Sequence, residues 1–195
     1  MSFQSKQEIS KTLREGGYNR EMVYLSMLSA FAVVIHSAEA SLPTPPWMKP
    51  GLANIITLTT IACFGFRCAI YVTLLRVLVG SIVIGTFLNP AFFLSFAGAG
   101  VSVLGMGLVH RWFPRTFSLI GISLIGAYLH SLAQISVVSL VFIRHTDIFF
   151  LFPLVLASAL PTGILTGIAA IHTTEKLNAF LKEKPSLPPF SSPLS

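Results

Sequence analysis

The chain has 195 residues, of which 53% are hydrophobic and only 10% are charged, and its mean hydropathy is +0.77. Soluble domains usually carry about 25% charged residues, and the charges here lie mostly outside long apolar runs. This composition excludes an ordinary soluble domain and predicts a multi-pass protein of the cell membrane.

Both ends of the chain are polar. Residues 1–20 mix charges and lack the apolar core of a secretory signal peptide, so we expect a short helix at the membrane surface. Residues 176–195 finish in KEKPSLPPFSSPLS, a run rich in Pro and Ser that is typical of a flexible tail. Between them we expect one transmembrane domain, residues 21–175, with no soluble domain attached.

Six apolar segments follow one another, and a bilayer core takes roughly 20 helical residues to cross. They are residues 22–38, 52–64, 66–87, 91–112, 117–143 and 148–171. The second is short, so we expect a shallow or partly buried helix that forms a tight hairpin with the third around Gly65. Pro90 opens the fourth segment, and Pro114 separates it from the fifth.

The basic residues predict the orientation, because cytoplasmic loops are enriched in Lys and Arg. With the N-terminus inside, the outside loops hold only two basic residues, Lys49 and Arg144. The inside segments hold ten: Lys6, Lys11, Arg14, Arg20, Arg67, Arg111, Arg115, Lys176, Lys182 and Lys184. We therefore predict an all-α membrane protein with six transmembrane helices and both termini in the cytoplasm.

Small residues recur at helical spacing in three segments, and small residues allow helices to approach closely in lipid. They are Ser26 and Ala30 in the first segment; Ser95, Gly98, Ser102 and Gly105 in the fourth; and Ala159, Gly163 and Gly167 in the sixth. For the fourth and sixth we favour packing within the protein. For the first, beside a basic N-terminal segment, docking of a partner protein is a real alternative to packing within the protein.

Arg76 stands ten positions after Phe66, about 15 Å into the membrane at ~1.5 Å per residue. A cation at that depth costs at least ~2.5 kcal/mol, and such residues usually face a partner or a cavity. Two interpretations stay open. Arg76 either ties helices together, through carbonyls or Glu39, or binds an anion at the floor of a cavity that opens to the outside.

Other polar residues fall at compatible heights in the outer leaflet. His130 and Gln134 lie four apart and hence on one helix face, and Ser95 lies one turn into the fourth segment. Asn54 lies in the first turn of the second segment, whose positive dipole end can seat an anion. The predicted substrate-binding set is Glu39, Lys49, Asn54, Arg76, Ser95, His130 and Gln134, unless these residues only tie helices together.

Several kinds of site are missing from the sequence. No phosphate-binding Gly-x-x-x-x-Gly-Lys loop occurs, and Asp147 is the single aspartate, so the aspartate clusters of prenyl-condensing enzymes cannot form. Cys63 and Cys68, without an accompanying His or carboxylate, do not suggest a metal site. We predict a protein that is not catalytic on its own and needs no cofactor, metal or nucleic acid.

The order of these residues resembles the Gx transporter family, also named heptaprenyl diphosphate synthase component I. The resemblance covers roughly residues 22–170. The block Lys49-Pro50-Gly51-Leu52-Ala53-Asn54-Ile55 is its most specific part, followed by Leu75-Arg76, Gly80-Ser81, Gly85-Thr86, Ser95 to Met106, and His130 with Gln134.

The resemblance implies a fold similar to the substrate-binding S components of energy-coupling-factor transporters. By that analogy the proline-rich loop 39–51 caps an outward pocket, and Ser26 and Ala30 dock onto a T component driven by two ATPases. The second family name implies a different role, that of an accessory subunit recruiting a soluble polyprenyl synthase, for which Arg111 and Arg115 are candidate contacts. Either ligand class, anionic or amphipathic, stays open.

Overall fold

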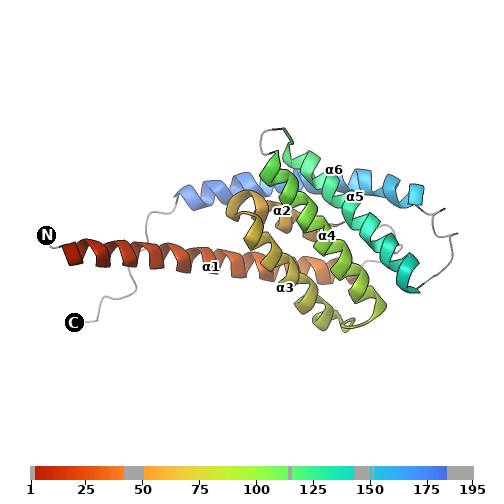
Figure 1. Ribbon diagram of the computed structural model, residues 1–195, viewed down its shortest axis with the longest axis horizontal. Coiled ribbons are helices and arrows are strands. Elements are labelled where there is room, and N and C mark those ends of the chain that lie inside the picture. The colour runs from red at the N-terminus through yellow and green to blue at the C-terminus, as the bar shows by residue number, and fades with distance from the viewer. Residues whose placement is uncertain (1–2, 42–50, 114–115, 143–149, 151, 184–195) are drawn as a thin grey trace.

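The computed structural model describes residues 3–41, 51–113, 116–142, 150 and 152–183. Within these ranges the protein is helical and contains no strand, which confirms the all-α fold (Figure 1). The helices are α1 (Phe3–Ser41), α2 (Ala53–Phe64), α3 (Phe66–Ile84), α4 (Pro90–Trp112), α5 (Leu119–Val137), its π-helical extension η1 (Val138–Phe142), and α6 (Phe152–Glu183). All but α2 contain a stretch long and apolar enough to cross a membrane. Six complete crossings and the cytoplasmic placement of the termini stay predictions.

Helix α2 forms the centre of the bundle and contacts each of the other five helices. Six consecutive residues, 56–61, are buried, so protein surrounds this helix on every side. Its 12 residues span only about 18 Å at ~1.5 Å per residue. A helix that short cannot bridge the lipid, but it is covered by its neighbours and is more deeply buried than the sequence suggested.

Two glycines fix the path of the chain around α3. Gly65, at φ 89°, joins α2 to α3 directly, and its N–H is donated to Thr60 O and Ile61 O, which confirms the tight hairpin. Gly85, at φ 76°, ends α3 because this left-handed conformation lets Thr86 N donate back to Ser81 O at 2.8 Å. Helix α3 therefore stops slightly earlier than the apolar run does.

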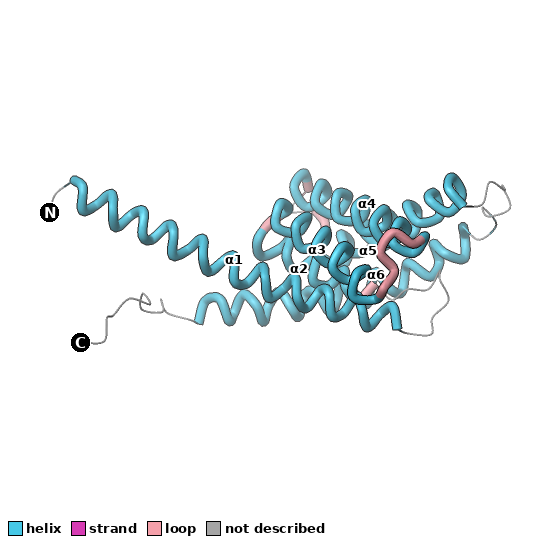
Figure 2. The backbone as a smooth tube through the Cα atoms, turned by 90° about the horizontal axis from the view of Figure 1, so that it is seen from below, coloured by secondary structure: helices cyan, strands magenta, loops and turns pink. Residues whose placement is uncertain are grey.

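The outermost helices are longer than predicted. Helix α1 is continuous from Phe3, so residues 3–20 prolong the first apolar helix instead of forming a separate one. At 39 residues it is about 58 Å long, nearly twice the ~30 Å hydrocarbon core, and its first half projects beyond the other helices (Figures 1 and 2). Helix α6 likewise continues to Glu183, into the segment expected to be a flexible tail. The start of α1 and the end of α6 lie at the same end of the bundle (Figure 1).

Glycine contacts hold α4, α5 and α6 together, as the spacing predicted. A Cβ on Gly167 would lie 2.7 Å from Ile120 Cα, and one on Gly163 would lie 3.0 Å from Leu124 Cα, so α6 rests directly on the α5 backbone. Ser102 Oγ of α4 donates to Gly126 O of α5 at 2.9 Å. The core beneath is apolar and consists of Leu58, Ile61, Ala69, Val103, Met106, Ile122 and Ala170.

Candidate functional site

A polar cavity lies among α1 to α5 at the end of the bundle where α1 ends and α2 begins, opposite the start of α1. Its volume is about 40 Å³, counted as space open to the centres of water molecules. Six of the seven predicted substrate-binding residues line it: Glu39, Asn54, Arg76, Ser95, His130 and Gln134. The seventh, Lys49, lies outside the described residues. That these residues bind a substrate stays a prediction, but the structure does bring the six together.

Glu39, buried near the end of α1, caps the N-terminus of α2. Its Oε1 accepts a hydrogen bond from Leu52 N, and its Oε2 accepts one from Ala53 N at 3.3 Å. The first N–H groups of a helix lack partners within the helix and carry its positive dipole end, so a carboxylate there is stabilising. The anion seat that the sequence placed at this terminus is therefore filled by a side chain of the protein itself.

Arg76 lies on the inner face of α3, beside Thr73 and Val77, and is only 3% exposed. Its Nη1 and Nη2 both donate to Asn54 Oδ1, each at 3.3 Å. Its Nε is buried and has no hydrogen-bond partner among the described residues. The guanidinium thus ties α3 to α2, as one interpretation predicted, yet it also lines the cavity with part of its hydrogen-bonding capacity unused.

Two histidines line the cavity, and each lies over a helix glycine. A Cβ on Gly98 would lie 2.9 to 3.0 Å from ring atoms of His130, and a Cβ on Gly80 would lie 2.6 Å from His36 Cδ2. Because Gly98 of α4 and Gly80 of α3 have no side chains, there is room beside them for the imidazole rings of His130 and His36. The sequence analysis missed His36, although its position three residues before Glu39 puts both on one face of α1.

The floor of the cavity becomes apolar within about one helical turn. Thr57 lies three residues after Asn54 and Thr73 lies three residues before Arg76, and the two hydroxyl oxygens lie 3.2 Å apart. Beyond this pair come Leu58, Ile61 and the rest of the apolar core. The cavity therefore ends inside the bundle.

The predicted docking residues on α1 face outward. Ser26 and Ala30 are both exposed, on the side of the helix that also exposes Met27, Phe31 and Val34. Ser26 Oγ donates to Met22 O at 2.8 Å, within its own helix. Nothing within the described bundle covers this face, and docking of a partner onto it stays a prediction.

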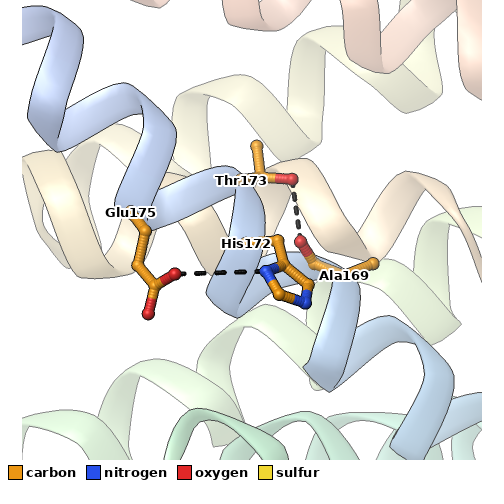
Figure 3. A network of polar contacts seen from close by, with 4 residues as sticks. All are labelled: Ala169, His172, Thr173 and Glu175. Atoms are coloured by element: carbon orange, nitrogen blue, oxygen red, sulfur yellow. Dashed lines mark hydrogen bonds and ion pairs between the residues drawn. The ribbon is translucent and has the colours of Figure 1, made fainter.

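A second group of polar residues lies near the end of α6 and, unlike the residues of the cavity, is largely exposed (Figure 3). His172 Nδ1 lies 4.0 Å from Glu175 Oε2, and these side chains are 72% and 70% exposed. Thr173 Oγ1 donates to Ala169 O at 2.8 Å. Exposed pairs of this kind contribute little to stability. The described residues contain no cluster of three His, Cys, Asp or Glu side chains suited to a metal ion.

Five helices that are long and apolar enough to cross a membrane place the chain among multi-pass helical membrane proteins. Within that class, the sequence model of the heptaprenyl diphosphate synthase component I family matches residues 28–173, and the chain belongs to this family. The match confirms the resemblance and includes every residue that lines the cavity. No curated protein and no solved structure matches the chain.

Proposed function

We propose that the protein is a membrane-embedded substrate-binding subunit that holds a small molecule in the cavity among α1 to α5. The observation that carries this proposal is Arg76, a guanidinium 3% exposed whose Nε lacks a hydrogen bond among the described residues. Burying a charge is costly unless its donors are satisfied, and nearly all buried donors in proteins are. A residue that served only to tie helices would gain from more acceptors than the single oxygen of Asn54.

The shape of the cavity supports binding followed by movement of the whole protein. Because the cavity ends above an apolar core, a ligand has no polar route through the bundle. The sequence contains no phosphate-binding loop to supply energy. Uptake would then require partner ATPases, as in the S components that the family resembles, with Ser26 and Ala30 of α1 as the docking face.

The family description favours a second candidate, a non-catalytic membrane accessory subunit of a polyprenyl diphosphate synthase. In that case a soluble synthase would bind the end of the bundle opposite the cavity. Arg111, exposed in the last turn of α4, is available there, and Arg115 lies outside the described residues.

Retention of a ligand during purification tests the first candidate. The protein is purified in mild detergent from its native membrane, and small molecules that elute with it are identified by mass spectrometry. Gly98→Ala should lose the ligand, because its new methyl group would lie 2.9 Å from the His130 ring and would displace a side chain that lines the cavity. Gly100→Ala is the matched control, since a Cβ there would meet nothing within 4 Å.

Absence of any retained molecule from the wild type, or equal retention by the two alanine variants, would refute ligand capture. The proteins that copurify separate the two candidates. Recovery of ATPases and a T component supports uptake, whereas recovery of a prenyl synthase supports the accessory role.

A further inference from the structure

The charged groups of the cavity differ in how completely the protein satisfies them. Among the described residues that line it, Arg76 is the only Lys or Arg, and Glu39 is the only carboxylate. Both oxygens of Glu39 accept backbone N–H groups at the start of α2. Within the described part of the chain, Arg76 donates only to a neutral amide oxygen, through two bonds that are long at 3.3 Å, and the nearby Glu39 carboxylate balances part of its charge. The hydrogen-bonding capacity that stays unused in the cavity is therefore that of the Arg76 guanidinium.

The donors of the guanidinium that have no partner define the shape of a further acceptor, although Nε itself is buried beneath the cavity wall. The two Nη atoms already share Asn54 Oδ1, which leaves Nε and the remaining Nη hydrogens for a further partner. A planar carboxylate binds the edge of a guanidinium through two parallel hydrogen bonds, which are stronger than bonds between neutral groups. The cavity is small, with about 40 Å³ open to the centres of water molecules, which favours a compact anionic group over a bulky one.

We propose that the cavity takes a single carboxylate group of a small organic acid, held by the donors of Arg76 that Asn54 leaves unused, once the guanidinium turns toward it. This inference rests on the proposed function and narrows its ligand class. The rest of the acid would extend along the wall formed by Ser95, His130 and Gln134, whose side chains can donate or accept hydrogen bonds. A diphosphate suits this cavity less well than a carboxylate, because its two phosphoryl groups are bulkier and its larger negative charge is repelled more strongly by Glu39.

Acetate and acetamide test the inference, since they share size and shape but differ in charge. Binding to the purified protein in lipid nanodiscs is measured by titration at constant ionic strength, with inorganic pyrophosphate as a third probe. Acetate should bind saturably to the wild type and to Gly100→Ala, whereas acetamide and pyrophosphate should bind at least about tenfold more weakly, as expected for loss of charge-assisted bonds. Arg76→Lys should weaken acetate binding about tenfold, because it keeps the charge but removes the planar edge.

The circular dichroism spectrum and unfolding temperature of Arg76→Lys must match those of the wild type, and Arg76→Gln provides a second variant if they do not. Equal binding of acetate and acetamide, tighter binding of pyrophosphate, or unchanged acetate binding in both Arg76 variants would overturn the carboxylate assignment. The retention experiment and the acetate titration can fail independently of each other. A neutral ligand lost in Gly98→Ala would leave the proposed function standing and refute only the carboxylate. Acetate binding that depends on Arg76, without any ligand retained during purification, would leave the carboxylate assignment standing and count against ligand capture.

Discussion

The two halves of the bundle bury different kinds of residue, although the same helices build both. Around the start of α2, the cavity half buries Glu39 and Arg76. Around the end of α2, the packed half buries a large apolar cluster that includes Leu58, Met106 and Ile122. In lipid, apolar side chains gain little by facing inward, so close packing and hydrogen bonds have to hold helices together. The packed half relies mainly on close packing, supplemented by hydrogen bonds such as that between Ser123 and Thr166 at 2.7 Å, and the cavity half relies mainly on hydrogen bonds.

This difference also explains what faces the lipid. The large apolar residues Tyr71, Ile82 and Val83 of α3 are more than 60% exposed, while Arg76 on the same helix is buried. Hydrophobicity alone therefore does not distinguish the residues that face inward from those that face the lipid, whereas small and polar residues within the apolar helices tend to face inward. Substitutions in the packed half should change stability alone, and substitutions in the cavity half should change binding unless they remove a helix cap.

Glu39→Ala should have the largest effect on stability, because it removes a cap and leaves two N–H groups of α2 and the nearby Arg76 charge without compensation. We expect a loss of about 3 kcal/mol in the free energy of unfolding. Unfolding by sodium dodecyl sulfate in mixed micelles, followed by far-ultraviolet circular dichroism, measures it. Glu39→Gln keeps one acceptor and should lose only about 1 kcal/mol. Equal losses in the two variants would show that the cap is unimportant.

Gly167→Ala should have the next largest effect, and it tests the packed half. Its new Cβ would lie 2.7 Å from the Ile120 Cα atom, so the backbones of α5 and α6 must separate. We expect a loss of about 2 kcal/mol by the same unfolding measurement, with acetate binding unchanged. Gly100→Ala should stay within about 0.5 kcal/mol of the wild type. A stable Gly167→Ala protein with weakened ligand binding would break the division between the halves.

Much of this architecture follows from the sequence. The apolar runs predict the helices, Gly65 predicts the hairpin, and spacings of four predict which faces of α4 and α6 pack. Polar residues that fall within apolar runs predict the cavity, because such positions are costly in lipid without a partner. For that reason Asn54, Arg76, His130 and Gln134 could be grouped before any coordinates were known.

Three features could not be read from the sequence for physical reasons. Glu39 and the start of α2 are separated in the sequence by residues 42–50, and no local pattern indicates that a carboxylate caps a distant helix. The polar start of α1 contains helix-forming residues but no apolar period, so its continuity with the membrane span was not evident. The burial of α2 depends on five neighbours, and its short apolar run is equally compatible with a shallow helix.

Ser102→Ala should have the smallest effect of the substitutions considered. Ser102 Oγ is fully buried and donates to Gly126 O at 2.9 Å, a side-chain hydrogen bond that joins α4 to α5. Hydrogen bonds between membrane helices average only about 0.6 kcal/mol, because the carbonyl oxygen keeps its helical partner and the unfolded chain finds others. Ser136→Ala is the matched control, since Ser136 is exposed and its hydroxyl donates to Leu132 O in its own helix. A loss above about 2 kcal/mol for Ser102→Ala would mean that hydrogen bonding, and not glycine packing, holds the packed half together.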